Sequence, residues 1–367
     1  MRTPSALWFR IKLHLPLILR VALILGLVLA VFFVGMYALR GCSFLSETVS
    51  SGGALLEGAS AQDSYQPFGS RLLRFDGTDL SCHDRNGEVS WTYTVSDAGA
   101  DYRLSASSSR AALFAGSRLI LLDDRGNAVY SGLMDGQISR VRCGDTTTAV
   151  ELEGSSSLIV LDKNGGELDL IDLSASTLVD FGFYSNNELL WTLSINISGL
   201  SPSSRLDIYK PGKELVSSYM SGTQFYYKPL FYQSDVYILG TEALDLASAS
   251  SVSYSVYGWQ YADSAILDDG LTIALTLSDE GSSPAMARVF RKGAFTDMHL
   301  PAGCFDLRCG EKGLYGVSNQ TLHLMPYDGS PMTTYAFRYT VADVVCVFSG
   351  HMAVSTAEGD VYLVKLP

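Results

Sequence analysis

The chain has 367 residues, of which 47% are hydrophobic and 17% are charged, with 34 glycines scattered along it. This composition excludes collagen-like, coiled-coil and wholly disordered proteins, and the chain is long enough to bury a core without disulfides. The net charge of −12 argues against nucleic acid as a partner, because a nucleic-acid-binding protein carries a basic footprint. Residues 1–40 hold five bases and no acid, so the 21 bases and 38 acids that remain give residues 41–367 a charge of −17.

The first predicted element is one transmembrane helix. Residues 21–39 contain no charge and are bounded by Arg20 and Arg40. At about 1.5 Å per residue, such a helix crosses the roughly 30 Å hydrocarbon core of a bilayer. Four bases precede this segment and one follows it before the acids begin, so residues 1–20 are expected to form a short cytoplasmic tail. The sequence thus predicts a single-pass protein of the cell membrane, with the bulk of the chain extracytoplasmic.

Two other interpretations of the N-terminus remain open. A cleaved signal peptide fits less well, because the apolar run exceeds the usual length of about 7–15 residues and no A-x-A site follows. Residues 39–42 resemble a bacterial lipobox, with Cys42 as the acylated residue, although Arg40 departs from that pattern. All three interpretations place the large part of the chain outside the cytoplasm.

Residues 40–64 are expected to be a flexible linker, because 46–64 are rich in Ser, Gly and Ala. The folded domain is expected to begin at Tyr65 and to occupy residues 65–367. In that part, short apolar runs alternate with turn residues every 8–12 positions, which indicates an all-β sandwich, barrel or propeller.

One pattern recurs three times in the folded part. An apolar strand ends in an Asp, and a Gly follows three residues later. The pairs are Asp84/Gly87, Asp123/Gly126 and Asp162/Gly165, with glycines 39 residues apart. An Asp side chain can accept N–H groups two residues on, and Gly can adopt the positive φ of a tight turn. We expect these blade turns to join the third and fourth strands of each repeat.

Later repeats keep the strand–turn–strand shape, with turn glycines expected at Gly212, Gly258, Gly293 and Gly329. A last unit ends the chain without a fourth strand. The sequence therefore predicts an all-β fold, a β-propeller of about eight four-stranded blades. Seven blades remain possible if the first and last units merge, and two packed β-sandwiches are a further alternative. The missing strand should come from Tyr65–Phe68 or from just before it, and so close the ring.

The repeats at 80–91, 119–130 and 158–170 resemble those of PQQ-like and WD-repeat-like propellers. In that pattern, strand and Asp-x-x-Gly are followed by a large residue, which here is Trp91, then Tyr130, and then Asp169 in the third repeat, where Gly166 is expected to shift the register. The whole arrangement is similar to a family of membrane-anchored propeller proteins of Gram-positive bacteria. This resemblance implies an N-terminal anchor and an extracytoplasmic propeller, and it implies no particular activity.

No catalytic signature is found. None of the five His lies in a hydrolase or metalloprotease motif, and no metal-ligand spacing occurs. Quinoprotein enzymes share the propeller, but they carry regular Trp docking motifs and this chain has only 4 Trp. We expect a protein without enzymatic activity, metal or cofactor. His83, beside the Asp84 turn, is expected to be a rim residue.

The cysteines leave their pairing open. Cys143, Cys309 and Cys346 occupy similar places in the expected first strands, which line the centre of a propeller, so they are expected to be small buried side chains. The expected compartment permits disulfides. Both Cys304–Cys309 and Cys309–Cys346 are compatible with the sequence.

An aromatic cluster at residues 225–232 is the candidate partner-binding surface. Its candidate residues are Phe225, Tyr226, Tyr227, Phe231 and Tyr232. Exposed aromatic rings make good recognition surfaces, while packing between blades is the alternative. The expected function is a protein-interaction or ligand-binding scaffold whose partner is an envelope protein, a peptide or a glycan. The alternatives are a factor similar to the eight-bladed outer-membrane assembly lipoprotein, and a cofactor-binding enzyme of quinoprotein type.

Overall fold

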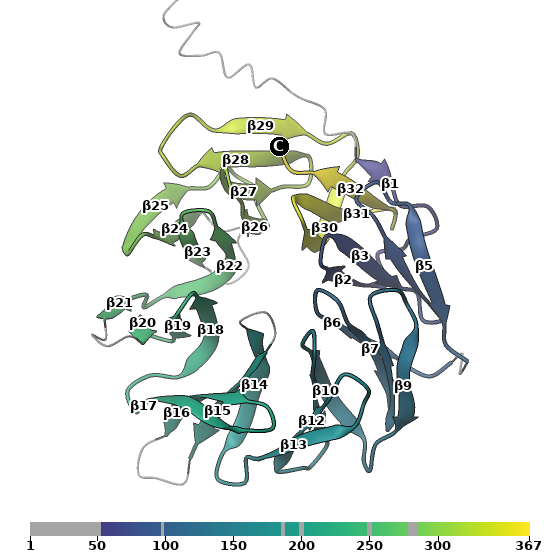
Figure 1. Cartoon of the computed structure of the whole chain (residues 1–367). Helices are drawn as coiled ribbons and strands as arrows, with labels where there is room; N and C mark the ends of the chain where they lie inside the picture. The colour runs from purple at the N-terminus through teal and green to yellow at the C-terminus, as the bar shows by residue number, and fades with distance from the viewer. Residues whose placement is uncertain (1–52, 97–98, 185–187, 198–201, 248–251, 278–284) are drawn as a thin grey trace, which may run out of the picture. The chain divides into compact units, whose positions relative to one another are not determined.

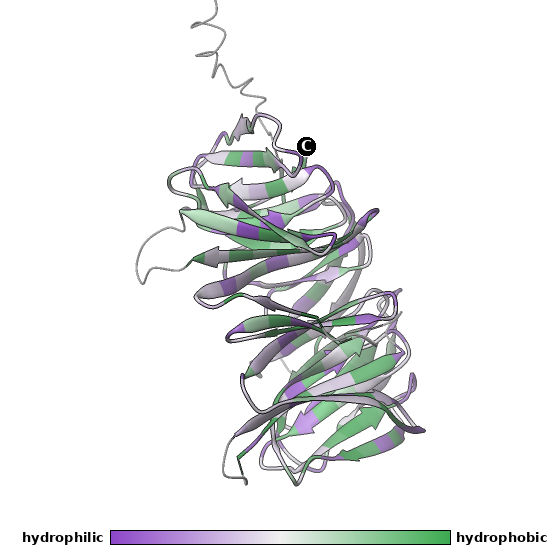
Figure 2. Cartoon of the chain, turned by 90° about the vertical axis from the view of Figure 1, so that its left-hand side faces the viewer, coloured by the Kyte–Doolittle hydropathy of each residue, from purple (hydrophilic) through white to green (hydrophobic). Residues whose placement is uncertain are grey.

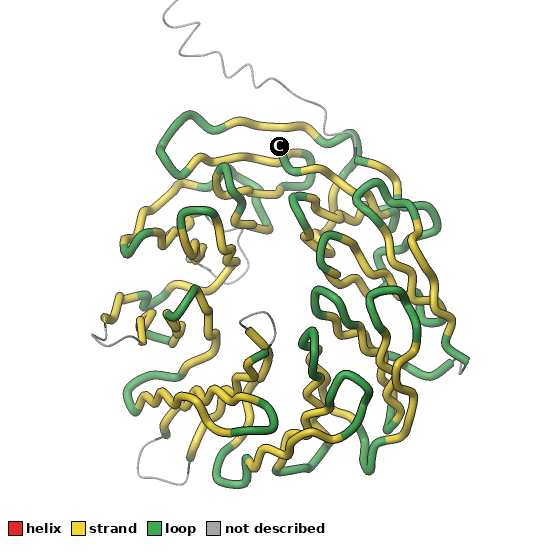
Figure 3. Tube along the Cα trace, in the orientation of Figure 1, coloured by secondary structure: helices red, strands yellow, loops and turns green. Residues whose placement is uncertain are grey.

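The computed structural model describes residues 53–96, 99–184, 188–197, 202–247, 252–277 and 285–367. These residues form eight antiparallel sheets of four strands each, arranged as the blades of a β-propeller (Figures 1 and 3). The predicted fold class and the count of eight blades are confirmed, and the seven-bladed alternative and the paired sandwiches are wrong. The described residues include no helix long and apolar enough to cross a membrane. The predicted helix at 21–39 lies outside them.

The first four blades follow the chain in order, each from its innermost to its outermost strand. Blade 1 contains β2 (Ser64–Phe68), β3 (Arg71–Phe75), β4 (Asp79–His83) and β5 (Val89–Thr94). Blade 2 contains β6 (Arg103–Ala106), β7 (Ala111–Ala115), β8 (Arg118–Leu122) and β9 (Ala128–Leu133). Blade 3 contains β10 (Ile138–Cys143), β11 (Thr148–Leu152), β12 (Ser157–Leu161) and β13 (Glu167–Asp172). Blade 4 contains β14 (Thr177–Tyr184), β15 (Leu189–Asn196), β16 (Ser203–Lys210) and β17 (Glu214–Ser221).

Blades 5 to 7 repeat this order, and blade 8 borrows a strand. Blade 5 contains β18 (Tyr226–Tyr232), β19 (Asp235–Gly240), β20 (Ala243–Ala247) and β21 (Val252–Ser255). Blade 6 contains β22 (Trp259–Leu267), β23 (Gly270–Leu277), β24 (Met286–Arg291) and β25 (Ala294–His299). Blade 7 contains β26 (Asp306–Cys309), β27 (Gly313–Val317), β28 (Thr321–Pro326) and β29 (Thr333–Ala336). Blade 8 contains β30 (Val341–Phe348), β31 (His351–Thr356), β32 (Val361–Lys365) and β1 (Ala54–Leu55).

The N-terminal strand β1 closes the ring, as predicted, by pairing with β32 as the fourth strand of blade 8. The closing residues lie ten positions before Tyr65, and Leu56 beside them is 1% exposed in a cluster with Leu363. The predicted boundary between linker and propeller at residue 64/65 is therefore too late. A stretch rich in Ser, Gly and Ala concealed two strand residues and a core leucine, because such a short strand has no periodicity. Tyr65 itself lies in β2.

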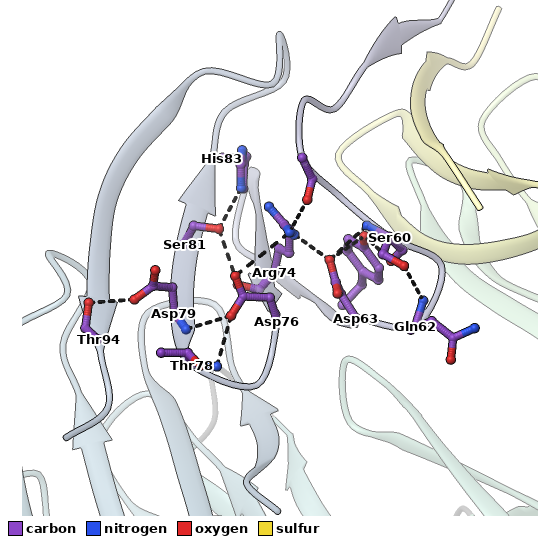
Figure 4. Close-up of polar contacts among 12 residues, drawn as sticks. Ser60, Gln62, Asp63, Arg74, Asp76, Thr78, Asp79, Ser81, His83 and Thr94 are labelled. Carbon is purple, nitrogen blue, oxygen red and sulfur yellow. Dashed lines mark hydrogen bonds and ion pairs between the residues drawn. The ribbon is translucent and has the colours of Figure 1, made fainter. Parts of the chain in front are cut away.

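A polar network ties the segment after β1 to blade 1 (Figure 4). The Asp63 carboxylate accepts a hydrogen bond from Arg74 Nε at 2.6 Å and one from the Ser60 N–H at 2.9 Å. Arg74 also donates to the Gly58 carbonyl oxygen, and the Tyr65 hydroxyl donates to the Ser60 carbonyl oxygen at 2.7 Å. The ion pair is largely buried, with side chains 14% and 8% exposed. This network fixes residues 58–63 on the ring.

The three predicted blade turns share one geometry. Asp123 Oδ1 accepts the N–H groups of Arg125 at 2.9 Å and Asn127 at 2.8 Å, and Gly126 has φ +81°. The turns at Asp84 and at Asp162 repeat both side-chain bonds, with Gly87 at +88° and Gly165 at +83°. The expected mechanism, an Asp acceptor with a glycine at positive φ, is confirmed in all three. The register shifts by one residue at the same place in all three hairpins, so the predicted extra shift at Gly166 is wrong.

One later turn was placed wrongly from sequence. Gly258 has φ +82°, but it lies between β21 of blade 5 and β22 of blade 6 instead of joining the third and fourth strands. The connection between those strands falls on residues 248–251, outside the described part of the chain. A glycine at positive φ marks a turn without saying which two strands the turn joins.

The core lies between neighbouring blades, where apolar side chains of one sheet meet those of the next. One such cluster joins blade 1 to blade 2 through residues that include Phe68, Leu80 and Leu113, all less than 1% exposed. Apolar and polar residues alternate along many strands, as the green and purple bands in Figure 2 show. Along outer strands such as β5, partly buried and exposed side chains alternate. Such a strand needs an apolar face only on the side that packs against its neighbour.

Candidate binding site on the innermost strands

The candidate site is built on the innermost strand of each blade, because these strands surround the centre of the ring (Figure 1). In five of them the register shifts by one residue near the start, and a charged residue follows the bulge. These residues are Arg140, Asp180, Lys228, Asp263 and Asp343. Bulges re-aim side chains at the rims of sheets. The repeated bulge therefore presents one charged group per blade at an equivalent place.

The remaining blades present a residue at the same place without a recorded bulge. We name the complete set the inner ring, and it consists of Ser64, Arg103, Arg140, Asp180, Lys228, Asp263, Asp306 and Asp343. The equivalence rests on the register with the second strand of each blade, where Ser64 pairs with Phe75, Arg103 with Phe114 and Asp306 with Val317. Two of the aspartates also share one type of hydrogen bond. Asp180 accepts the N–H of the next residue at 2.9 Å, and Asp343 does so at 2.8 Å. Seven of its eight members are charged.

The charges of the inner ring are segregated by sign. Blades 2 and 3 contribute Arg103 and Arg140, whereas blades 6, 7 and 8 contribute Asp263, Asp306 and Asp343. In Figure 1, β6 and β10 lie across the ring from β22 and β26. Like charges on neighbouring strands repel one another, so this order costs stability that an even alternation of signs would not. Asp180 of blade 4 and Lys228 of blade 5 lie between these two arcs, so the ring is basic at blades 2 and 3 and acidic at blades 6 to 8.

The basic side contains a hollow of about 450 Å³ between the innermost strands of blades 1 to 3. Three arginines line it, namely Arg103, Arg140 and Arg142, together with Ser64, Tyr65, Gln66, Leu104, Phe114, Ser139 and Val141. No carboxylate is among these lining residues. In a chain with a net charge of −12, such a local excess of base is unusual. We name this feature the inner basic hollow.

The acidic side is built around Asp263 and Asp306. Burial raises the pKa of Asp263 above its usual value, although the Cys309 N–H, which donates to its Oδ2 at 2.7 Å, and Arg308 both oppose this. Burial also raises the pKa of Asp306, and repulsion from Asp263 adds a smaller increase, while the ion pair with Arg308 at 2.8 Å opposes both. Asp263 is thus close enough to Asp306 to disfavour the ionisation of Asp306. Among the described residues no group of three or more potential metal ligands is found.

A larger cavity of about 880 Å³ lies at blades 6 to 8. Its wall includes Ile266 after the bulge of β22, Tyr315 of β27, Tyr335 of β29 and Val347 of β30. The Tyr315 hydroxyl donates to the Pro367 carbonyl oxygen at 2.9 Å, which holds the chain end against this wall. The volume suits a small ligand.

The predicted aromatic cluster does not form one surface. Tyr226 is 6% exposed, and its hydroxyl donates to Asp245 at 2.8 Å. Phe231 stacks on Tyr184 of the preceding blade with ring centroids 3.9 Å apart. Only Phe225 and Tyr227 are exposed, at 42% and 37%. Tyr232 is half-buried beside the cluster that joins blades 5 and 6. Strand alternation sends adjacent aromatics to opposite faces of the sheet, so a run of rings in the sequence is divided between core and surface.

Two histidines of the blades, His83 and His323, are buried and hydrogen-bonded. His83 is 2% exposed, with one ring nitrogen 2.7 Å from the Ser81 hydroxyl oxygen and the other 3.1 Å from the Gly87 carbonyl oxygen (Figure 4). Burial lowers its pKa. The position of His83 beside the Asp84 turn is confirmed. Its imidazole is buried against that turn instead of lying at the rim of the propeller.

The described cysteines are free thiols, so neither proposed disulfide is present. As predicted, Cys143, Cys309 and Cys346 lie in innermost strands and are buried. Burial raises the pKa of Cys304 to about 11 and that of Cys346 to about 12, which leaves little reactive thiolate at neutral pH. Cys42 lies outside the described residues.

The inner ring was not recognised from the sequence. A weak signal was present, since the first strands of blades 3, 7 and 8 read RVRC, DLRC and DVVC, each with a charge beside buried residues. From the sequence, that pattern predicted only that the cysteines are buried. The spacing from one inner strand to the next varies too much for single charged residues to be aligned without the blade structure.

No protein-family model matches this sequence, and no curated protein matches it in sequence. Solved structures share its fold. BamB from Moraxella catarrhalis superposes with a TM-score of 0.52 at 13% identity, covering 83% of this chain and 96% of that one. The C-terminal WD40 domain of Sif2 gives a TM-score of 0.54 at 10% identity, covering 83% and 95%. At such low identities these comparisons show that the chain is similar to known β-propellers in fold, and nothing finer.

Proposed function

We propose that this protein is a binding scaffold without enzymatic activity, held on the outer side of the cell membrane, whose propeller takes its ligand or partner at the centre of the ring. The observation that carries the proposal is the segregation of charge on the innermost strands. Arg140 is already paired with Glu151 and Asp306 with Arg308, so each arc is neutralised only in part, and a partner of opposite charge offsets the remaining repulsion when it binds. Groups placed on strands of a closed ring are also pre-organised for binding.

The membrane anchor is part of this proposal and rests on the sequence of residues 21–39 with its flanking bases. Such a helix would leave the propeller, which begins at residues 53–55, close to the outer surface of the membrane. Protease added to intact cells lacking an outer wall should digest the propeller, while alkaline carbonate should leave the full chain in the membrane fraction. A protein that carbonate releases, or one protected from the protease, would contradict the anchored arrangement.

Site-specific photo-crosslinking in cells tests where the partner binds. A benzophenone side chain at position 139, beside the inner basic hollow, is compared with one at position 131 on the outer strand β9. Both positions hold a serine, which makes the pair matched. Adducts should form from position 139 and be absent from position 131. Adducts from position 131 alone would contradict binding at the centre.

A second candidate function has its own observation. The outermost strands β13 and β17 carry exposed aliphatic side chains, among them Leu170, Val216 and Met220 at 55%, 53% and 70% exposure. Each is an edge strand in its sheet. Exposed apolar edge strands can pair with strands of another chain, as an assembly factor of the cell envelope would require. Crosslinks from position 131 or 216, without crosslinks from position 139, would support this alternative.

A further inference from the structure

The inner basic hollow has the composition of an anion site. Its guanidinium groups converge from two neighbouring strands, Arg103 from β6 and both Arg140 and Arg142 from β10. The hydroxyl-bearing Ser64 and Ser139 and the amide of Gln66 are also in its wall. Guanidinium forks match the geometry of carboxylate and phosphate groups, which accept two parallel N–H bonds.

Two of the three arginines are already paired. Arg140 forms a two-pronged ion pair with Glu151, at 2.5 Å from Nε and 3.2 Å from Nη2. Arg142 reaches Asp180 at 3.3 Å, and its side chain remains 47% exposed. Neither acid lines the hollow. An exposed ion pair of this kind is worth about 0–1 kcal/mol, so an arriving anion can compete for Arg142.

Arg103 supplies the unneutralised charge. Its Nη1 donates to the Ser139 carbonyl oxygen at 2.8 Å and its Nη2 to the Ile138 carbonyl oxygen at 2.7 Å. Among the ion pairs found in the described part of the chain, none involves Arg103. The guanidinium lies over the Phe114 ring, 4.5 Å from its centroid. Two of its five N–H groups are therefore used on neutral acceptors, and three remain for a ligand.

This arrangement is pre-organised. The two carbonyl contacts and the Phe114 ring hold the fork of Arg103 in place, although the residue is exposed to solvent. A side chain that is already held loses less rotamer freedom when it binds. The charges of the three arginines, Glu151 and Asp180 leave one positive charge in excess around a hollow of about 450 Å³. The vacant donors and the excess charge point to the same class of ligand.

We propose that the inner basic hollow binds an oxyanion, namely the carboxylate or phosphate group of a small solute, with Arg103 as its main anchor and Arg142 as the second contact. This inference rests on the proposed function and names the chemistry of the ligand at the centre of the ring. Neither arginine contacts a substrate in a chemical step, so both act as binding residues. Arg140 is held in its ion pair with Glu151 and forms part of the wall of the hollow.

The test is calorimetric titration of the full chain in detergent micelles. Sodium phosphate and sodium succinate are titrated separately at constant ionic strength set with sodium chloride, because screening weakens any exposed charge contact. Binding of one of the two separates a phosphate ligand from a carboxylate ligand. The variants are Arg103→Gln, Arg103→Lys and Arg142→Gln. Arg125→Gln is the control, since it removes the same charge from an exposed turn of blade 2.

We expect saturable binding of at least one anion. Arg103→Gln should raise Kd at least about tenfold, and Arg142→Gln about threefold, in line with the loss of charge-assisted hydrogen bonds. Arg103→Lys should lie between wild type and Arg103→Gln, because lysine keeps the charge without the planar fork. Arg125→Gln should match wild type. Thermal unfolding of each variant shows whether it is folded, and the exposed Arg142 provides a second variant if Arg103→Gln does not fold.

Absence of saturable binding by both anions would overturn the inference. Equal losses in Arg142→Gln and Arg125→Gln would overturn it as well, because they would show a general effect of net charge. If crosslinks from position 139 persist in either case, the scaffold proposal stands and only the oxyanion inference fails. If those crosslinks are also missing, both fail.

Discussion

The indole ring of Trp91 in blade 1 lies against Gly126 in the blade turn of blade 2. A Cβ atom at Gly126 would be 2.6 Å from Trp91 Cε3, and Trp91 Nε1 donates to the Asp124 carbonyl oxygen at 3.1 Å. The next interface repeats this contact, with Tyr130 of blade 2 against Gly165 of blade 3. At the third interface Asp169 accepts the Gly212 N–H at 2.9 Å. The residue four positions after each turn glycine therefore contacts the following blade, through an aromatic ring at the first two interfaces and through a carboxylate at the third.

Substitution of Gly126 by alanine should destabilise the ring through two effects. The residue has φ +81°, which costs an L-residue about 1–2 kcal/mol, and the new methyl group would collide with the indole ring. We expect Gly126→Ala to lower the free energy of unfolding by about 3 kcal/mol, as measured by urea denaturation. Gly258→Ala is the matched control, because Gly258 has φ +82° with no atom within 4 Å of an added Cβ. Equal losses in the two variants would show that the docking contact does not matter.

Closure of the ring depends on a leucine outside the predicted domain. Leu56→Ala should lower the free energy of unfolding by about 2–4 kcal/mol, since Leu56 is 1% exposed in the core of blade 8. Leu55→Ala, at 49% exposure one residue earlier, should cost less than about 0.5 kcal/mol. Thermal and chemical unfolding of both variants provide the measurement. If Leu56→Ala leaves the free energy of unfolding unchanged, residues 53–56 do not close the ring in solution.

The blade turn at Asp123 should contribute stability that depends on pH. Partial desolvation raises the pKa of Asp123, but bonds from Asn127 and Arg125 outweigh it and hold this pKa below its usual value. A carboxyl with a lowered folded-state pKa stabilises above its unfolded pKa of about 3.9, and this stability is lost as the pH falls through the folded value. Asp123→Ala should therefore cost about 1 kcal/mol at pH 7 and less at pH 3.

The matched control for that experiment is Asp124→Ala. Asp124 is exposed in the same turn and takes part through its carbonyl oxygen, which alanine keeps. Its pH profile of unfolding should follow that of wild type. A constant difference between Asp123→Ala and wild type from pH 7 to pH 3 would contradict the role of the ionised carboxylate.

The acidic side of the ring should show the opposite pH dependence. The folded-state pKa of Asp263 is raised, mainly by burial, so its contribution is present below the unfolded pKa and is lost as the pH rises through the folded value. Asp263→Asn removes this ionisation while its amide oxygen still accepts the Cys309 N–H. We expect the variant to be more stable than wild type at pH 7 and equal to it at pH 3.

Guanidinium denaturation at several pH values measures this difference. Asp124→Asn removes one exposed carboxylate and serves as the control for net charge. A variant less stable than wild type at pH 7 would indicate that the ionised Asp263 is well compensated by its neighbours. The charge of the acidic side would then carry no cost in the absence of a ligand.

The sequence by itself determined the repeated unit of this protein. Asp84, Asp123 and Asp162, each with a glycine three residues later, specify their turns through local hydrogen bonds and positive φ, so their geometry is readable without any tertiary contact. Alternating apolar runs between turns predicted four strands per blade, and the missing last strand required closure from the N-terminal side. These features depend on residues close together in the chain.

Only the tertiary structure decided which residues meet at the centre and between the blades. Arg103 and Arg142 are 39 residues apart, yet they line one hollow because successive innermost strands lie side by side. Phe231 became an interface residue and Phe225 a surface residue because the pleat of one strand directs neighbouring rings to different faces. Leu56 became core because two strand residues before it completed a distant sheet. Local patterns fix turns and strands, whereas the ring fixes which strand faces which.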